Sequence, residues 1–241
     1  MKVTLVSVTP NAAELLLFTK STRLNLNAGL LDEIKAWPPE KKQAELAYMA
    51  NTIPSSWEFV QYVFAIEGVS RAYTHQQVRT RAASYAQQTM RVLDMSGGYD
   101  YVFTERNQQS PMAMAIIRAH KEVTQLAYRD LIEEGQPPED ARGILPTNIA
   151  TNIVCQFNLR TMAELAGSRT GGRTQTEYQR VVNSMCDEVI AVHPWADQFL
   201  FQKGRDYFQE LEDFARAEWP DNLLKRGAML KIIDKMRKEK N

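Results

Sequence analysis

Arginines and short polar side chains are concentrated in one stretch of the sequence, residues 79–91, which reads RTRAASYAQQTMR. The stretch has three arginines, several Ser, Thr and Gln residues, and no Lys, Asp or Glu. An arginine side chain is planar and always charged, and its fork of donors matches the oxygens of a phosphate. Neutral hydroxyl and amide groups can orient a base or a sugar. The stretch therefore predicts a binding site for a phosphorylated ligand.

Several other kinds of chemistry lack their usual motifs in this sequence. His75, His120 and His193 do not have the spacing of metal ligands, and there is no paired-cysteine motif, so we expect no metal site. The sequence has no Gly-x-Ser-x-Gly, no phosphate loop, no dinucleotide glycine motif and no recognisable pair of catalytic carboxylates. If the protein is an enzyme, we expect a cofactor to supply the difficult chemistry.

The composition narrows the class of protein. The 241 residues include 29 Lys and Arg against 29 Asp and Glu, so we expect no nucleic acid partner. Residues 1–8 are too short for a signal segment, and no apolar run is long enough to span a membrane. Cys155 and Cys186 lie in apolar contexts, which predicts free thiols and a reducing cytoplasm.

The pattern of apolar, breaker and capping residues predicts more helix than strand. In the first half it predicts strands over 3–8 and 57–66, a break at 68–70, and helices over 11–19, 39–49 and 71–79, the last capped by Ser70. In the second half it predicts a polar loop over 96–110, helices over 111–134, 138–142, 158–165 and 174–192, and an ambiguous segment over 147–156. We expect an α+β fold with helices packed on a small mixed or antiparallel sheet. The prediction is a single domain over 1–241 with a helical C-terminal extension over about 195–241.

Three blocks of the sequence carry a family resemblance. Residues 68–91 resemble the central motif of the flavin-dependent thymidylate synthases, which have Arg-His-Arg, then a serine, a Glu or Gln, and Ser-x-Arg. Residues 55–58, SSWE, are similar to the upstream flavin-contacting segment of that family. Residues 141–177 are similar to its downstream half, through Arg142, Leu145-Pro146, Asn158-x-Arg160, Arg169, Gln175 and Glu177. The resemblance covers about residues 50–192.

The resemblance implies a reaction and an assembly. The reaction is the reductive methylation of dUMP to dTMP, in which methylenetetrahydrofolate gives the carbon and FAD, reduced by NADPH, gives the hydride. The partner is therefore a deoxypyrimidine monophosphate. The assembly is a homotetramer whose active sites are shared between subunits.

The resemblance also implies roles for particular residues. It places Arg169 against the pyrimidine as the catalytic residue, where a fixed positive charge favours the ionised ring. It places nine residues at the flavin: Ser55, Glu58, Arg79, Thr80, Arg81, Gln87, Asn158, Arg160 and Glu164. It places nine at the nucleotide: Gln76, Arg79, Gln87, Gln88, Thr89, Met90, Arg91, Arg142 and Arg169.

Some positions differ from the family pattern. Thr80 replaces the central histidine, Thr89 a serine, Glu164 a His or Asn, and Arg173 a histidine, while Ile53 and Val92 stand where the family stacks a histidine and a tyrosine. These differences would fit a divergent member, such as a viral one, and they bear most on the folate site. Two alternatives stay open. The same fold could act on dCMP or add a hydroxymethyl group, or the chain could be a non-catalytic homologue that binds nucleotide or flavin.

Overall fold

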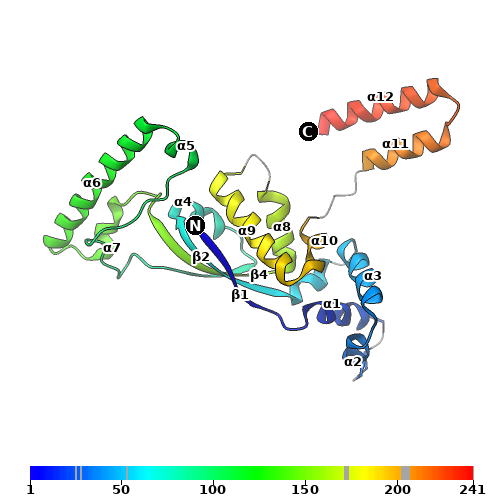
Figure 1. Ribbon diagram of the computed structural model, residues 1–241, viewed down its shortest axis with the longest axis horizontal. Helices are drawn as coiled ribbons and strands as arrows, with labels where there is room; N and C mark the ends of the chain where they lie inside the picture. Colours follow the sequence, from blue (N-terminus) through cyan, green and yellow to red (C-terminus); the bar gives the residue numbers. More distant parts are fainter. Residues whose placement is uncertain (25, 28, 53, 171–173, 202–206, 241) are drawn as a thin grey trace. The chain divides into compact units, whose positions relative to one another are not determined.

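The computed structural model describes the chain except residues 25, 28, 53, 171–173, 202–206 and 241, and except the side chains of 207–210, 213 and 238–240. The chain divides into two units, residues 1–202 and 203–241, each of which is described by itself. The first unit holds the sheet and the helices that pack on it (Figure 1). The second unit consists of a pair of helices, in which the Glu212 carboxylate lies 3.2 Å from Arg237 and 3.6 Å from Arg216.

The sheet has four strands in the order β1-β2-β4-β3. They are β1 (Lys2–Val8), β2 (Gln61–Ser70), β3 (Ala83–Gln87) and β4 (Ala150–Asn158). Every pair of neighbouring strands is antiparallel, so the sheet is of the antiparallel kind rather than mixed. The α+β class expected from the sequence is confirmed, and β2 and β4 form its two central strands.

The helices of the first unit fall into three groups along the chain. Before β2 lie α1 (Ala12–Ser21), α2 (Leu30–Lys35), α3 (Pro39–Ala50) and the 3-10 helix η1 (Pro54–Phe59). Between β2 and β4 lie α4 (Arg71–Gln77), α5 (Glu105–Gln108), α6 (Pro111–Glu133), α7 (Pro138–Ala141) and η2 (Arg142–Ile144). After β4 lie α8 (Leu159–Arg169), α9 (Thr176–Val192), η3 (Pro194–Ala196) and α10 (Asp197–Leu200). The second unit holds α11 (Tyr207–Glu218) and α12 (Leu223–Lys240).

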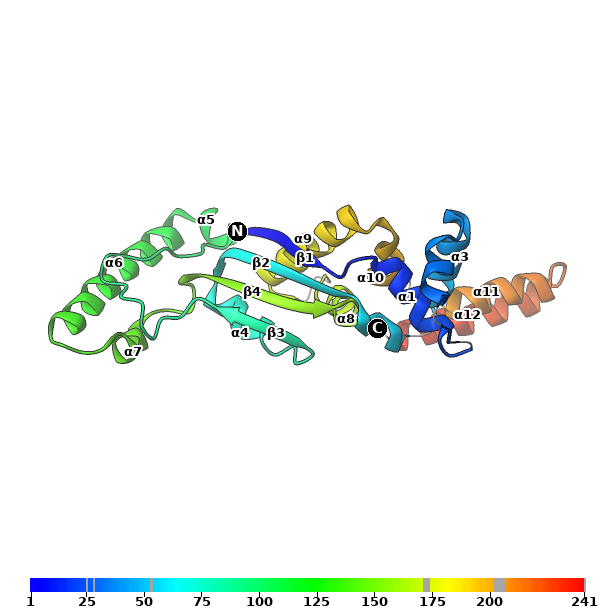
Figure 2. The same ribbon diagram turned by 90° about the horizontal axis from the view of Figure 1, so that it is seen from below.

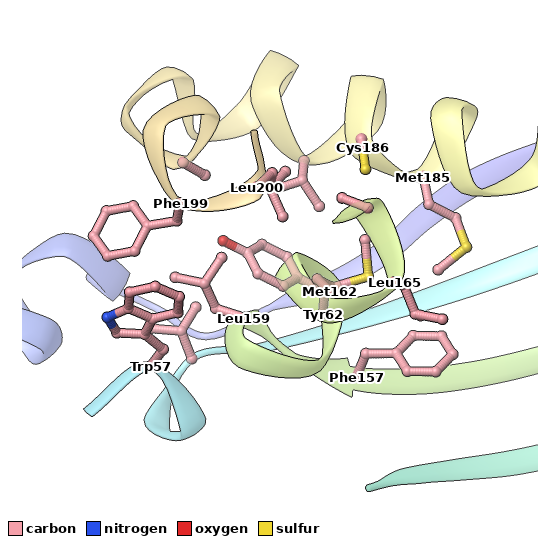
Figure 3. Packing of buried hydrophobic residues seen from close by; sticks show 14 of the residues in the cluster. Trp57, Tyr62, Phe157, Leu159, Met162, Leu165, Met185, Cys186, Phe199 and Leu200 are labelled. Atoms are coloured by element: carbon pink, nitrogen blue, oxygen red, sulfur yellow. The ribbon is translucent and has the colours of Figure 1, made fainter. Parts of the chain in front are cut away.

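The main core lies between the sheet and the helices α8 and α9. Alternate residues of β2 and β4 are buried, as expected for strands with one face on a core. Met162 and Leu165 of α8 and Met185 of α9 point into an interior shared with Tyr62 and Phe157 (Figure 3). The Cys155 and Cys186 thiols are free and buried, and burial raises the pKa of each to about 12, so both thiols are protonated at neutral pH.

The segment 89–149, called the arm below, leaves the sheet after β3 and returns to it at β4 (Figure 2). It has a small core of its own, made by Tyr99, Tyr101 and Ile149. The rings of Tyr99 and Tyr101 stack 5.6 Å apart, and the Lys121 ammonium of α6 lies over both rings. A bridge between Tyr101 and Ile149 closes the arm, and the Ala150 N–H at the start of β4 donates to the Asp100 carbonyl oxygen at 2.8 Å.

Two predictions about β2 are wrong. Residues 57–59 belong to η1 rather than to a strand, since Pro54 starts a tight turn and Trp57 turns inward to donate its ring N–H to the carbonyl oxygen of Met49 at 3.2 Å. The strand does not break at 68–70. It passes through a register shift between Ile66 and Val69, where Gly68 adopts a φ of 65° that suits a glycine.

Other elements also differ from the prediction, and the predicted polar loop over 96–110 contains helix α5. Helix α4 ends at Gln77 instead of Arg79, and α8 continues through Gly167 to Arg169. A glycine inside a helix costs only about 1 kcal/mol, so it need not end one. The ambiguous segment 147–156 proves to be mainly strand β4. Strand β3 and helix α2 were not predicted, because both are short and, apart from Tyr85, β3 consists of small and polar residues.

Among the described residues, none of the helices combines the length and apolar content needed to cross a bilayer. Within the same residues, no group of three or more His, Cys, Asp or Glu side chains is placed to hold a metal ion.

Candidate functional site

The candidate site begins at Ser70, which is both the last residue of β2 and the N-cap of α4. The Ser70 Oγ accepts a hydrogen bond from the Tyr73 N–H at 3.0 Å, which confirms the predicted cap. The Ser70 N–H and hydroxyl both donate to the Glu177 carboxylate of α9, at 2.7 and 2.5 Å. Helix α9 therefore fixes where α4 starts, and with it the positions of the residues that follow.

Arg71, the first residue of α4, lies against the nucleotide-binding stretch expected from the sequence. Its Nη2 donates to the carbonyl oxygen of Gln88 at 2.6 Å. Its Nε is buried and has no hydrogen-bond partner among the described residues. Burial lowers the pKa of Arg71, and the nearby positive charge of Arg142 lowers it further. A buried donor beside a like charge is a site that an anion would stabilise.

Two more arginines come from the arm and meet at Glu139. The Arg91 Nε pairs with the Glu139 carboxylate at 2.7 Å, and the Arg142 Nε donates to the Glu139 carbonyl oxygen at 3.0 Å. We call the five residues Arg71, Gln88, Arg91, Glu139 and Arg142 the arginine cluster. It holds three guanidinium groups and one carboxylate, so its own charge favours an anion.

A second group of charged residues lies where β4 passes into α8. Arg160 pairs with Glu58 of η1 at 2.7 Å and with Glu164 at 3.3 Å. The hydrogen bond with Glu58 is the main reason that the pKa of Arg160 is raised. The Asn158 Oδ1 accepts from the Thr161 N–H at 2.8 Å and so caps α8. We call Glu58, Asn158, Arg160 and Glu164 the Arg160 group.

Between these two groups runs β3 with the turn that precedes it. Arg79 and Arg81 are exposed, and neither has an ion-pair partner in the part of the chain that the structure describes. The Tyr85 hydroxyl donates to the carbonyl oxygens of Gln77 and Thr80, at 2.8 and 2.9 Å, and so holds the turn closed. This bonding and the edge-on contact with Phe157 explain Tyr85 as a packing residue.

Two glutamines predicted at the site make contacts inside the protein. The Gln87 amide donates to the Thr74 hydroxyl at 2.9 Å, so this side chain points inward to α4. The Gln76 amide donates to the Gln175 side-chain oxygen, just before α9. Both side chains therefore stiffen the connection between α4 and its neighbours.

Arg169 ends α8, and its guanidinium carbon lies 5.3 Å from the centre of the Tyr178 ring. The Tyr178 ring packs edge-on against Tyr73 of α4 at 5.3 Å. A cation held over an aromatic face keeps its charge and is oriented by the ring. Arg169 is exposed, so its donors stay accessible to a ligand.

The structure brings together some of the predicted residues and separates others. Gln88, Arg91 and Arg142 lie in the arginine cluster, beside Thr89, whose hydroxyl accepts from the Arg91 N–H at 3.0 Å. Met90 packs on the small core of the arm. The Arg160 group lies at the other end of β3, and a five-residue strand is about 17 Å long. Ser55 is exposed, and its hydroxyl accepts from Arg23 at 3.0 Å.

Sequence reasoning gave no site role to three residues that organise the site: Arg71, Glu139 and Glu177, the last of which it named only as part of the resemblance. Arg71 follows directly after the predicted cap, and this position at the start of a helix could have marked it. Nothing in the sequence indicated the contacts of Glu139 and Glu177, since their partners are 48 and 107 residues away. Of the positions that differ from the family pattern, Val92 is 75% exposed. Ile53 and Arg173 lie outside the described residues.

Comparisons with known proteins give a family match that covers the three sequence blocks 55–58, 68–91 and 141–177. A family model described as thymidylate synthase complementing protein matches residues 4–195. The flavin-dependent thymidylate synthase of Sulfolobus acidocaldarius is 34% identical over 163 residues, which are 68% of this chain and 60% of that protein. The enzyme of the same name from Nitratidesulfovibrio vulgaris is 34% identical over 209 residues, 78% of this chain and 83% of that protein.

A third relative with that name, from Sulfurisphaera tokodaii, is 36% identical over 133 residues, which are 55% of this chain and 51% of that protein. The chain thus spans between about half and five-sixths of the length of these curated relatives. The family match includes β1 through α9 and both groups of charged residues described above. The chain therefore belongs to the family of the thymidylate synthase complementing protein and the flavin-dependent thymidylate synthases.

Proposed function

We propose that this protein is a flavin-dependent enzyme that reductively methylates dUMP to dTMP, with methylenetetrahydrofolate as carbon donor and NADPH as reductant. The observation that carries the proposal is the arginine cluster. It combines a buried, unpartnered Arg71 N–H among the described residues with two further guanidinium groups. The names of the curated relatives support the flavin and the synthesis of thymidylate.

The nucleotide phosphate fits the arginine cluster. An unsatisfied buried donor costs about 1–3 kcal/mol, and a phosphate oxygen at the Arg71 Nε would remove that cost. The same phosphate has further oxygens for Arg91 and Arg142, which come from the arm. Because Glu139 already pairs with Arg91, the phosphate would compete with this carboxylate for that guanidinium.

The rest of the nucleotide would lie along α4 and β3. We assign the binding of its sugar and base to Arg79, Gln88 and Thr89. Gln76, Gln87 and Met90, whose side chains make contacts inside the protein, would hold this stretch in place. We assign the catalytic charge to Arg169, whose guanidinium group lies over the Tyr178 ring. A fixed cation beside the pyrimidine stabilises negative charge that develops on the ring.

The flavin would lie toward the Arg160 group. When bound, reduced FAD would supply the hydride for the transfer. Arg79 and Arg81 suit a dinucleotide, since both are exposed and without an acidic partner among the described residues. The residues that we assign to the flavin are those of the resemblance: Ser55, Glu58, Arg79, Thr80, Arg81, Gln87, Asn158, Arg160 and Glu164.

The two groups of charges lie at opposite ends of β3, which suits a long ligand and a site completed by a second subunit. We therefore propose a homotetramer with shared active sites. The separation along β3 supports this assembly because each end leaves charged side chains exposed on one chain.

The first experiment records the visible spectrum of the purified protein with and without added FAD. It then follows NADPH oxidation and the mass of the product with dUMP, and with dCMP beside it. We expect flavin binding, faster oxidation with dUMP, and a product heavier by one methyl group. If the protein binds no flavin, the proposal is contradicted. If a product forms from dCMP and not from dUMP, the proposed substrate is wrong.

The second experiment tests the phosphate site by substitution. Arg71→Ala should weaken binding of dUMP strongly but leave binding of deoxyuridine, which has no phosphate, unchanged. Arg106→Ala, an exposed arginine of α5, is the matched control. Arg169→Ala should abolish turnover without loss of the fold. Equal binding of dUMP by Arg71→Ala and the control would remove the arginine cluster from the site.

A further inference from the structure

Helix α6 has an inner face that the arm covers and an outer apolar face that is exposed. The inner face packs into the arm through Ile117, Lys121, Thr124 and Tyr128. The outer face carries large apolar side chains that are highly exposed, namely Met112 (71%), Ile116 (62%), Val123 (67%) and Leu126 (50%). Ala119 lies between them and is exposed as well. We call these five residues the outer stripe.

The spacing of the outer stripe is that of a coiled-coil seam. Its residues follow one another at intervals of four, three, four and three, which is the heptad pattern. On a helix of 3.6 residues per turn they lie within an arc of about 80°. From Met112 to Leu126 the stripe is about 21 Å long. A seam of this kind packs against a helix with the same spacing, and α6 of a second copy has that spacing.

We propose that the outer stripe of α6 packs antiparallel on the outer stripe of a second copy of this chain. This inference deepens the proposed assembly of identical subunits and assigns it a surface. In the antiparallel arrangement Ala119 lies opposite Ala119 of the partner subunit, and Met112 lies opposite Leu126. A small residue at the centre lets the two helices approach closely.

The charges along α6 favour the antiparallel direction. Its N-terminal half carries Arg118 and Lys121 and no acidic residue, whereas its C-terminal half carries Glu122, Asp130 and Glu133 against a single arginine. An antiparallel pair puts the basic half of one helix beside the acidic half of the other. Arg118 and Glu122 flank the stripe and are exposed, and neither has an ion-pair partner in the described part of the chain.

The surface beside Leu126 has room for the partner. A hollow of about 320 Å³ lies there, lined by Ser96, Glu122, Gln125, Leu126 and Arg129. The end of the partner's α6 that carries Met112 would lie over this hollow. A long, flexible methionine side chain suits a hollow of irregular shape.

Cysteine cross-linking in the full chain tests the pairing. Ala119→Cys should give a disulfide-linked dimer under mild oxidation, because a disulfide needs Cβ atoms about 3.5–4.5 Å apart. The control is Ala44→Cys, an exposed alanine of α3, and the native cysteines are buried. Met112→Cys and Leu126→Cys should each cross-link poorly alone and well when the two variants are co-expressed. No dimer from Ala119→Cys, or a strong dimer from Met112→Cys alone, overturns the proposal.

Charge reversal gives a second test that leaves the stripe intact. Arg118→Glu and Glu122→Arg should each weaken self-association in sedimentation experiments, and co-expression of the two variants should restore it between chains. Their failure to complement each other would count against the antiparallel register. Neither test depends on flavin, nucleotide or turnover, so the pairing can fail while the proposed reaction stands, or the reverse.

Discussion

The arm and the rest of the first unit, residues 1–88 and 150–202, have different kinds of core. We call that larger part the body. In the body, aromatic and aliphatic side chains from the sheet, α8 and α9 form one large core, in which Phe64, Phe157 and Tyr178 are fully buried. In the arm, three residues make a small core, and α6 exposes its outer stripe. The difference matters for the site, because the arginine cluster takes Arg71 from the body and Arg91 and Arg142 from the arm. The phosphate site that we propose therefore depends on how the less-packed region holds its two arginines.

The largest effect should come from the core of the body. Phe157→Ala removes a ring that contacts Phe64 and Tyr85, at ring-centre distances of 6.4 and 5.9 Å. A cavity of this kind costs about 3–5 kcal/mol, so we expect the first unit to lose most of its stability as a whole. Urea unfolding followed by circular dichroism measures the loss. Val154→Ala, at a half-exposed position of the same strand, should change little.

The matching change in the arm is Ile149→Ala, which empties the centre of the small core. It should cost about 2 kcal/mol or more, but the loss should be local to the arm. Hydrogen exchange read by mass spectrometry should show faster exchange over 95–149 and little change in β2 and β4. Uniformly faster exchange in both regions would mean that the body and the arm unfold as one unit.

A smaller effect is expected at the ion pair that the arm contributes to the arginine cluster. Glu139→Gln keeps the shape of the side chain and removes the charge that pairs with Arg91. The pair is well exposed, so it contributes about 0–1 kcal/mol to stability. We expect tighter binding of dUMP by a few-fold, since Arg91 becomes available to the phosphate. Calorimetric titration would show this, and weaker binding would mean that Glu139 positions Arg91 instead of competing for it.

The smallest effect should be a pH dependence of the body alone. The His193 Nδ1 and the Tyr62 hydroxyl share a hydrogen bond at 3.1 Å, and the His193 ring stacks on Trp195. Burial lowers the pKa of His193 below its ordinary value of 6.5. The unfolded chain then binds a proton more readily than the folded one. The free energy of unfolding should therefore fall as the pH drops below about 6.5, toward the folded pKa. His193→Asn should make this slope shallower, and an unchanged slope would assign it to other groups.

The sequence predicted the elements whose ends carry strong local signals. Pro111 and Gly135 bound α6, and Ser70 caps α4, because ring geometry, glycine conformation and hydroxyl capping act within a few residues. Trp57 was misjudged because an aromatic run has the same composition in a strand as in a buried 3-10 turn. Strand β3 gave too weak a signal, since Tyr85 is its one residue of high strand propensity and the other four are small or polar. It becomes a strand by pairing with β4.

The candidate site was predictable in composition but not in arrangement. The arginines of 79–91 and Arg142 indicated an anion site, which stays a prediction. Their grouping depends on contacts between distant residues. Arg91 meets Glu139 across 48 residues, and Arg160 meets Glu58 across 102. Local sequence patterns do not indicate ion pairs between residues so far apart in the chain. The division of the site into two groups is therefore seen only in the structure.

The double hydrogen bond from Ser70 to Glu177 has a consequence for how the protein is made. The two residues are 107 positions apart, and the start of α4 is anchored only when both are present. A chain emerging from the ribosome can pair β1 with β2 early, but it cannot anchor α4 until the first turn of α9 has been synthesised. The helix that carries Arg71 and leads to Arg79 is thus completed late, so binding competence should appear near the end of translation of the first unit.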